Sequence, residues 1–283
     1  MKLVLGTVQF GIPYGINNSK GIPSDNEISD ILNLAYKESI NYIDTAISYG
    51  NAEKKISKLS ENKFNIITKS NNIKTKVELL TSISNSLKRL KVNAVYGYLF
   101  HNSDNLIKFP ELWDTLMEIK NLNKTKKIGC SVYNTDQLDK ILDKGILPDI
   151  VQLPYSLLDR KFQKYFPKLK SLGVEIHVRS IFLQGLYFMD IKKLPLKIIP
   201  LKKSLLKLHH LCAKLNILIG ELALNFVYNN PYIDKVIIGF DSMDQLYQNI
   251  NMIKNWNNKI KINESVNKIN VTDENLLNPT NWN

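Results

Sequence analysis

The sequence predicts an α/β protein that folds as a single (β/α)8 TIM barrel over residues 1–283. Eight short apolar segments recur along the chain, and most are followed by an amphipathic helical pattern. Strands that are buried on both faces have this apolar character, and their alternation with helices is typical of parallel βαβ units. No linker divides the chain, and barrels of this type often comprise about 250 residues in one domain. These observations together favour one closed barrel.

The expected strands and the first helices follow from apolar spacing. The eight strands cover residues 3–7, 41–45, 64–69, 95–101, 127–132, 149–154, 174–180 and 235–240. A helix is expected to begin at Ser24, which forms the pattern of a capping box with Glu27. Apolar residues at helical spacing mark three helical faces: Ile28, Ile31, Leu32 and Ala35; Leu79, Leu80, Ile83, Leu87 and Leu90; Leu112, Leu116 and Ile119.

The C-terminal third departs from this simple alternation. Residues 184–199 are rich in lysine and are expected to form a long loop after the seventh strand. Two helical patterns then follow in place of one, over 201–215 and 219–230, and Asn216 separates them. After a last helix over 242–255, residues 255–283 are expected to form a C-terminal tail near the barrel mouth.

Composition narrows the class of function. The net charge is +12, but arginine supplies only three of the 38 basic residues, and no arginine-aromatic cluster typical of nucleic-acid binding occurs. We therefore expect no nucleic-acid partner. No apolar run approaches the roughly 20 residues that span a bilayer, so no membrane association is expected either. Two lone cysteines, Cys130 and Cys212, favour reduced thiols and a cytoplasmic location.

Four ionisable residues lie at or just after the ends of the second, third and fourth strands: Asp44, Tyr49, Lys69 and His101. In a barrel of this type, active-site residues come from the C-terminal ends of the strands, so we expect these four to face one mouth. A cation near a phenol lowers its pKa, and a carboxylate holds that cation in place. A neutral imidazole can orient a carbonyl group. The set is suited to protonating an oxygen atom that gains negative charge.

Several motifs resemble those of the aldo-keto reductase superfamily, in the same order along nearly the whole chain. They are GTVQFG in the first strand, YIDTAISYGNAEKKISKL around Asp44 and Tyr49, and LALNFVYNNPYIDKVIIGFDSMDQLYQNI near the C-terminus. The resemblance implies NAD(P)H-dependent reduction of an aldehyde or ketone, with Tyr49 as general acid and Asp44, Lys69 and His101 completing a catalytic tetrad. The short loops and basic rim are similar to bacterial members of surface-sugar pathways, which favours a keto-sugar or nucleotide-sugar substrate.

The same resemblance implies a binding site for NADP or NAD. Gly6 and Thr7 would form its floor, and Ser131 and Gln152 would hold the carboxamide. The residues after strand seven, beside the pyrophosphate, would be Arg179, Ser180, Phe182, Gln184 and Gly185. The far phosphates and the adenine would contact residues 239–249, in particular Gly239, Asp241, Ser242, Gln245 and Asn249. No metal site is expected.

Three positions depart from the family pattern. Val132 follows Ser131 where the family often has asparagine, so one carboxamide contact is lost. Arg179 replaces a tyrosine that often stacks on the nicotinamide; its guanidinium could stack in the same way or bind an acidic group on the substrate. Asp241 lies where NADP-dependent members often carry a basic residue, which favours NAD or dual use. Positive charge on Lys192, Lys193 and Lys197 would act in the opposite direction.

An alternative function remains open from the sequence: a non-catalytic barrel that binds the nucleotide as a redox sensor or partner subunit. The complete tetrad argues against it, because a pure nucleotide binder does not need Lys69 behind Tyr49. The substrate pocket is expected to form from the loop after His101, the 184–199 loop and the tail with Trp256 and Trp282. The remaining expectations are a small-molecule carbonyl substrate and a monomer or weak oligomer.

Overall fold

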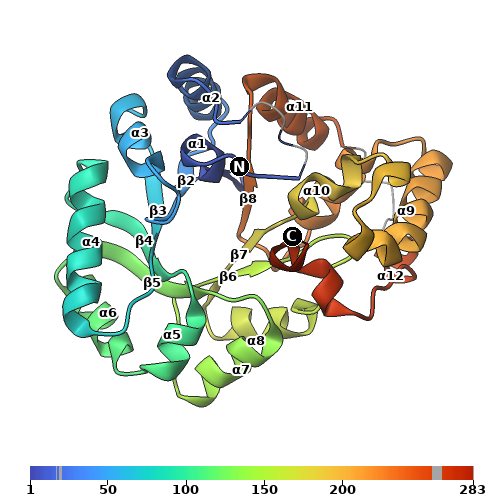
Figure 1. Ribbon diagram of the computed structural model, residues 1–283. Coiled ribbons are helices and arrows are strands. Elements are labelled where there is room, and N and C mark those ends of the chain that lie inside the picture. The colour runs from blue at the N-terminus through green and yellow to red at the C-terminus, as the bar shows by residue number, and fades with distance from the viewer. Residues whose placement is uncertain (17, 19–20, 257–262, 283) are drawn as a thin grey trace.

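The strands form a closed parallel barrel, which confirms the predicted fold class (Figure 1). The computed structural model describes residues 1–283 except 17, 19–20, 257–262 and 283. Each strand pairs with its neighbours in chain order, and β8 closes the barrel against β1. The strands are β1 (Leu3–Gly6), β2 (Tyr42–Asp44), β3 (Asn65–Ser70), β4 (Val95–Phe100), β5 (Thr125–Ser131), β6 (Ile150–Pro154), β7 (Glu175–Arg179) and β8 (Lys235–Gly239).

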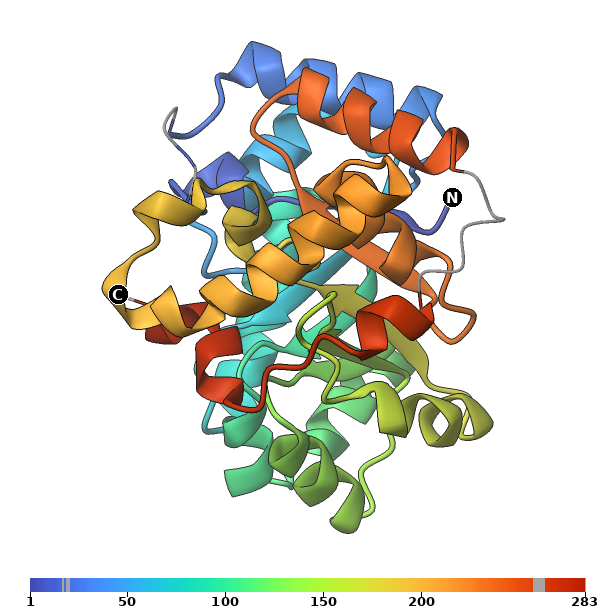
Figure 2. The ribbon, with the colours of Figure 1, turned by 90° about the vertical axis from the view of Figure 1, so that its right-hand side faces the viewer.

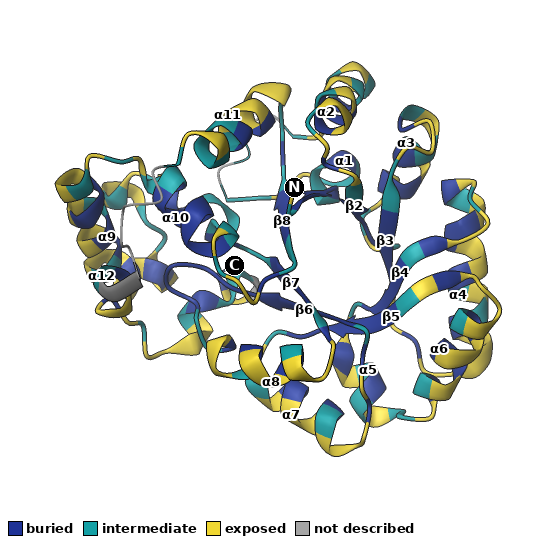
Figure 3. Ribbon diagram, turned by 180° about the vertical axis from the view of Figure 1, so that it is seen from behind, coloured by how far each residue is buried: buried dark blue, intermediate teal, exposed yellow. Residues whose placement is uncertain are grey.

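Helices surround the barrel and turn their buried faces toward it, while exposed residues lie on their outer faces (Figure 3). They are α1 (Val8–Gly11), α2 (Asp25–Lys37), α3 (Ala52–Leu59), α4 (Lys76–Leu90), α5 (Ser103–Lys108), α6 (Leu112–Asn121), α7 (Thr135–Asp143), α8 (Phe166–Ser171), α9 (Lys202–Leu215), α10 (Ile219–Tyr228), α11 (Met243–Lys254) and α12 (Asn263–Asn267). The apolar residues predicted for α2 are all buried, because the stripe they form faces the strands.

The segment after β7 is more regular than the predicted loop. It consists of three 3-10 segments, η2 (Leu183–Phe188), η3 (Ile191–Lys193) and η4 (Leu196–Leu201). Pro200 lies inside η4, and because proline cannot donate a backbone hydrogen bond, it favours short turns over a long α-helix there. Asn216 ends α9 in the left-handed conformation, with a φ angle of 52°, and so separates α9 from α10 as expected.

The N-terminus of α2 differs from the prediction in one detail. The Ser24 hydroxyl accepts a hydrogen bond from the Glu27 backbone at 3.2 Å, but the expected capping box is wrong. The Glu27 carboxylate instead accepts a hydrogen bond from the backbone N–H of Met243, at 2.9 Å, on α11. Helix α4 forms the complete capping box, with Thr75 and Glu78. The local pattern is the same in both helices, so the neighbouring α11 decides the difference.

The inside of the barrel is layered. Ile67, Leu99 and Ile150 are fully buried and pack together in its middle. Beneath them, near the N-terminal ends of the strands, lies a floor cluster of polar and aromatic side chains: Tyr42, Tyr96, Lys127, Glu175, His177 and Lys235. The Lys235 ammonium lies 3.7 Å from the centroid of the Tyr42 ring, which packs edge-on against Tyr96. Cation–π and ionic contacts therefore close this end of the barrel.

Glu175 is the centre of the floor cluster. Its carboxylate accepts hydrogen bonds from the Tyr96 hydroxyl at 2.9 Å and from Lys127 at 2.5 Å, and His177 lies 3.1 Å from it. Burial disfavours the charged carboxylate, but the hydrogen bonds from His177, Lys127 and Tyr96 outweigh it and lower the pKa of Glu175 to about 2. The carboxylate is therefore more stable ionised in the folded protein than in the unfolded chain.

Acid stability should depend on this carboxylate. Because its folded-state pKa is depressed, Glu175 contributes stability that is present above its unfolded pKa and is lost as the pH falls toward 2. Full loss would cost up to about 3 kcal/mol. Glu175→Gln should therefore lower the unfolding free energy by about 1–3 kcal/mol at neutral pH. In urea titrations at a series of pH values, the unfolding free energy of this variant should decrease less steeply toward acid pH than that of the wild type. Glu118→Gln, which removes an exposed ion pair with Lys76, should leave this pH dependence unchanged.

Both cysteines are free and buried, as expected, Cys130 on β5 and Cys212 on α9. Among the described residues, no single helix is long and apolar enough to cross a membrane. Residues 196–215 and 219–228 meet that criterion only as a pair, and a 92° bend separates them.

Candidate active site

The structure brings the four predicted residues together at one end of the barrel. Strands β2, β3 and β4 are adjacent, so the end of β2, the end of β3 and the residue after β4 lie side by side. Lys69 lies 2.5 Å from the Asp44 carboxylate and 5.4 Å from the centre of the Tyr49 ring. The rings of Tyr49 and His101 pack edge to face, with centroids 5.7 Å apart. The arrangement expected from the apolar pattern is therefore present.

Asp44 is the hub of this site. One carboxylate oxygen accepts from Lys69, and the other accepts from the side-chain amide of Gln152 at 2.8 Å. The backbone carbonyl of Asp44 accepts from both the amide and the hydroxyl of Thr7, each at 3.0 Å. Strands β1, β2, β3 and β6 thus meet at one residue.

The Lys69–Asp44 pair is almost fully buried, with side-chain exposures of 0% and 3%. Burial lowers the pKa of Lys69, and the charge of Asp44 opposes that shift. The ammonium also donates to the carbonyl oxygen of Thr45 at 2.9 Å, so its position is set by two partners. A buried ion pair held in this way needs both members, since either charge alone would be left without compensation.

The prediction that Lys69 lowers the pKa of the Tyr49 phenol is wrong for this arrangement. Burial raises the pKa of Tyr49 well above its ordinary value, and the Asp44 carboxylate adds to the shift, while Arg179 opposes it. The reason is geometric: the Lys69 ammonium is committed to Asp44 and Thr45, so Asp44 balances its charge. Tyr49 therefore keeps its proton at neutral pH, which is the state that a proton donor needs.

Two glycines position Tyr49. A Cβ atom at Gly11, the last residue of α1, would lie 1.7 Å from the carbonyl oxygen of Tyr49. Gly50 has a φ angle of +57°, and a Cβ there would lie 2.5 Å from the carbonyl oxygen of Gly11. Only bare backbone permits α1 to approach the loop after β2 this closely. We did not predict Gly11 as a site residue, because its contact partner lies 38 positions along the sequence.

His101 is neutral and is held by a residue that sequence reasoning missed. Burial lowers the pKa of His101 to about 3, and the nearby positive charges of Lys69 and Arg179 add to the effect. The Ser48 hydroxyl lies 3.1 Å from Nδ1 of the ring. When that hydroxyl donates to Nδ1, the neutral ring carries its proton on Nε2 and can donate it in a hydrogen bond. Ser48 directly precedes Tyr49, and that proximity was the available signal.

Arg179 ends β7 and stacks on an aromatic ring. Its guanidinium lies 4.1 Å from the centroid of Tyr133 and donates to the carbonyl oxygen of Val132 at 3.1 Å. Its charge acts on the pKa values of Tyr49, Lys69 and His101, so it belongs to the same electrostatic environment. The sequence pointed to Arg179 but not to Tyr133, its stacking partner.

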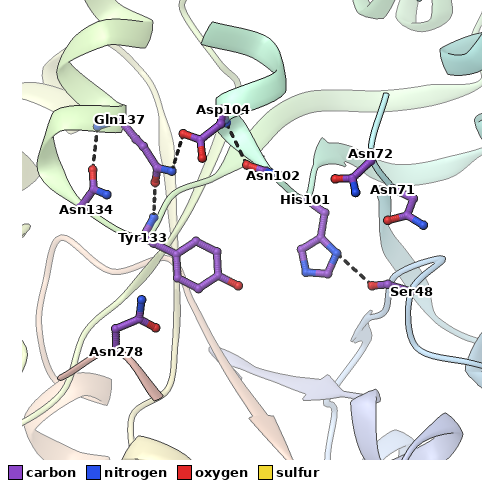
Figure 4. A pocket seen from close by; sticks show the side chains of 10 residues that line it. All are labelled: Ser48, Asn71, Asn72, His101, Asn102, Asp104, Tyr133, Asn134, Gln137 and Asn278. Atoms are coloured by element: carbon purple, nitrogen blue, oxygen red, sulfur yellow. Dashed lines mark hydrogen bonds between the residues drawn. The ribbon is translucent and has the colours of Figure 1, made fainter. Parts of the chain in front are cut away.

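A cleft of about 490 Å³ opens beside His101 (Figure 4). Its lining is almost entirely uncharged and polar: Ser48, Asn71, Asn72, His101, Asn102, Asp104, Tyr133, Asn134, Gln137 and Asn278. Several of these groups are fixed by one another, since Gln137 donates to the Asp104 carboxylate at 2.8 Å and accepts from the Tyr133 backbone at 2.7 Å. Among the residues that the structure describes, no aliphatic side chain lines the cleft.

The tail contributes to this cleft differently from the prediction. Asn278 lines it, whereas Trp282 is 8% exposed, and its indole nitrogen donates to the carbonyl oxygen of Leu276. Trp256 is partly buried against the core. Neither tryptophan lines this cleft, and both rings pack with the apolar core, so their part in a substrate pocket stays a prediction. Part of the predicted tail, residues 257–262 and 283, lies outside the described residues.

Comparison with known proteins identifies the family. The model of the aldo/keto reductase family matches residues 2–270. The chain belongs to the aldo/keto reductase family. Members of this family are oxidoreductases that act on carbonyl groups with a nicotinamide cofactor.

Individual relatives are distant. The aldo-keto reductase AKR11C1 from Bacillus halodurans, in its holo form, aligns with a TM-score of 0.77 and 20% identity over 95% of this chain and 91% of its own. A Pseudomonas aeruginosa protein described as an aldo-keto reductase gives 0.69 and 22%, over 89% and 88%. Aldo-keto reductase YhdN of Bacillus subtilis is 27% identical over 90 residues, which are 31% of this chain and 27% of that relative.

The ends of strands β1 and β8 offer a fit for such a cofactor. A Cβ at Gly6 would lie 3.2 Å from the backbone nitrogen of Gly239, so β1 and β8 end in closely spaced bare backbone. Buried oxygens of Gln9 and Asn249 have no hydrogen-bond partner among the described residues. Such acceptors suit the hydroxyl and amino groups of a nucleotide. Ser131, the last residue of β5, and Gln152, in the middle of β6, are both buried. Their contact with the carboxamide stays a prediction.

The loop after β7 has an unusual backbone. Ser180, Leu183 and Gln184 are non-glycine residues with φ angles of 61°, 46° and 54°, and Gly185 follows with 92°. Conformations of this kind cluster at ligand-binding loops. The Gln184 amide donates to the Tyr14 hydroxyl at 2.8 Å, which ties this loop to the segment after α1. Phe182, also predicted here, packs edge-on against Phe188.

The residues predicted at α11 serve first as helix caps. Ser242 accepts from the Gln245 backbone at 3.3 Å, and Gln245 accepts from the Asp241 backbone at 2.9 Å. Asn249 donates to the Gln245 carbonyl oxygen at 2.7 Å. Their contact with a cofactor stays a prediction. Among the described residues, no group of three His, Cys, Asp or Glu side chains could hold a metal ion.

Proposed function

We propose that this protein uses NADH or NADPH to reduce the carbonyl group of an uncharged, polyhydroxylated sugar unit, either in a free keto-sugar or in the sugar of a nucleotide-sugar. The observation that carries the proposal is the constellation of a protonated Tyr49, a neutral His101 and the buried Lys69–Asp44 pair at one mouth. A site of this kind can bind, polarise and protonate a carbonyl oxygen.

Each residue of the tetrad has its own role in the proposed reaction. A nicotinamide cofactor bound at this mouth would supply the hydride for the carbonyl carbon. His101 donates a hydrogen bond to the carbonyl oxygen and orients it, and Tyr49 transfers its proton to that oxygen as negative charge develops. Once Tyr49 has lost its proton, the cations near the phenolate are Arg179 and the Lys69 ammonium, which lies 5.4 Å from the ring centre and is held in place by Asp44. The product is an alcohol, and Tyr49 recovers its proton from water.

The cleft supports the choice of substrate. Asn102 and Asn134 use their side-chain oxygens as helix caps, so their amide N–H groups are the parts left to bind a substrate. Asn71, Asn72 and Asn278 line the same cleft. Hydroxyl groups can pair with amides and with the remaining acceptor capacity of Asp104, whereas an apolar aldehyde would bury these groups without partners.

Reduction rates with a matched substrate panel test this proposal. A ketose, its deoxy analogue and a simple aliphatic aldehyde are each mixed with the protein and NADH or NADPH, and loss of cofactor absorbance is followed. We expect kcat/KM for the ketose to exceed that for the aldehyde by more than about tenfold. Asn71→Leu should reduce kcat/KM for the ketose alone. Equal rates for all three would refute the substrate class, and no reduction of any carbonyl would refute the reductase activity.

A further inference from the structure

Helices α2 and α11 lie side by side on the outside of the barrel, although they are more than 200 residues apart in the sequence (Figure 2). Near one end of the pair, the Glu27 carboxylate on α2 accepts the hydrogen bond from Met243 N, the first backbone amide of α11. Near the other end, Glu38 pairs with Lys254 at 2.5 Å. One helix thus supplies a carboxylate to each end of its neighbour.

Glu27 is one of three side chains that accept hydrogen bonds from backbone amides at the N-terminus of α11. The Ser242 hydroxyl accepts from the Gln245 amide, and the Gln245 side chain accepts from the Asp241 amide. The backbone donors of Asp241, Met243 and Gln245 are therefore all used within the protein. A helix start normally attracts anions because its N–H groups are unpaired and its dipole is positive there. Here the N–H groups of Asp241, Met243 and Gln245 already have acceptors within the protein.

A second carboxylate lies at this helix start. Glu27 is joined there by Asp244, in the first turn of α11. Two lysines near α2, Lys55 and Lys58, both pair with Asp25. The lysines that the sequence suggested as opposing charges, Lys192, Lys193 and Lys197, lie on η3 and η4, which pack against α9.

NAD and NADP differ only in a phosphate on the adenosine ribose. The proposed cofactor site places the adenosine end beside residues 239–249, so that phosphate would meet the start of α11. We propose that Glu27 is a specificity-determining residue that favours NADH, because it occupies the first amide of α11 and repels the additional phosphate. The inference rests on the proposed function only in requiring that a nicotinamide cofactor binds along β8 and α11.

Direct binding measurements test this role without turnover. Dissociation constants for NADH and NADPH are measured by quenching of tryptophan fluorescence in the wild type, Glu27→Gln and Glu38→Gln. Glutamine at position 27 keeps the accepting oxygen and removes the charge. Glu38→Gln removes the same charge from the opposite end of the same helix pair, so it controls for net charge and for helix packing.

We expect the wild type to bind NADH at least about tenfold more tightly than NADPH. Glu27→Gln should tighten NADPH binding by about fivefold to tenfold, a change of the size that one nearby like charge produces. The dissociation constant for NADH should stay within about twofold of the wild-type value. Glu38→Gln should leave the dissociation constants of both nucleotides unchanged. An NADPH affinity equal to that of NADH in the wild type, or the same change in both variants, overturns the inference.

Salt dependence of the wild type gives a second readout, which stands even if Glu27→Gln does not fold. Repulsion between exposed charges is screened as ionic strength rises. The ratio of the NADPH to the NADH dissociation constant should therefore fall with added salt, and a ratio that stays constant or rises contradicts the role of Glu27. Failure of both nucleotides to bind the wild type would instead refute the proposed cofactor site itself.

Discussion

Replacing Tyr49 with phenylalanine is expected to lower kcat by about a thousandfold, with little change in cofactor affinity. The substitution removes the proton that the proposed reaction delivers to the carbonyl oxygen, and general acids contribute about 10²- to 10⁴-fold. The ring itself remains, so its edge-to-face contact with His101 and the close approach of Gly11 are retained. Steady-state reduction of the best substrate, together with NADH binding by fluorescence, measures both effects.

Tyr14→Phe is the matched control for this experiment. The Tyr14 hydroxyl accepts a hydrogen bond from Gln184 and lies near enough to Tyr49 to add to its raised pKa, yet it is not part of the tetrad. Its loss should change kcat by less than about tenfold. A Tyr49→Phe variant that keeps most of its activity would transfer the acid role to another group. A variant that also loses NADH binding would show that the ring supports the fold of the site.

Separating Lys69 from Asp44 should produce the largest loss of stability at the site. Lys69→Met leaves the Asp44 carboxylate buried without its cation, and Asp44→Asn leaves the ammonium without its anion. Removing one member of a buried pair costs about 3–5 kcal/mol, because the remaining charge is not compensated. Urea denaturation of each variant at neutral pH gives this loss, and kcat should fall in both.

The double variant Asp44→Asn with Lys69→Met distinguishes a structural pair from a catalytic one. Since no charge is left buried, much of the stability should return, and the two single losses should not add. Activity should not return, because the Lys69 ammonium beside the Tyr49 ring is then missing. Additive losses of stability would mean that the two residues act independently. Recovery of turnover in the double variant would exclude Lys69 from the proposed mechanism.

Much of the fold follows from local patterns. All eight expected strands are present with ends that differ by at most two residues, because strands buried on both sides have an apolar character that turns interrupt. Helix α9 is followed by Asn216, a residue type that tolerates the left-handed conformation, so the break between α9 and α10 could also be predicted from the sequence. The 3-10 segments of residues 183–201 were not predicted, because their turns depend on packing against α9 and α10.

The four tetrad positions could be predicted for a related reason. Parallel strands in a barrel all end at the same side, so residues that close β2, β3 and β4 must be neighbours. Their electrostatics could not be predicted in the same way. Whether Lys69 acts on Tyr49 or is balanced by Asp44 depends on a distance of a few ångströms, and the predicted direction of the Tyr49 pKa shift was accordingly wrong.

The sequence by itself determined the barrel, the position of the tetrad at its mouth and the family, since these depend on apolar periodicity and on residues near strand ends. Only the tertiary structure decided the partners of individual side chains. Ser48 reaches His101 across 53 positions and Glu27 reaches Met243 across 216. Ser24 and Glu27 at the start of α2 match a local capping pattern, yet the Glu27 carboxylate accepts its hydrogen bond from Met243 on α11. A hydrogen bond depends on distance in space, which sequence spacing does not specify beyond one or two helical turns.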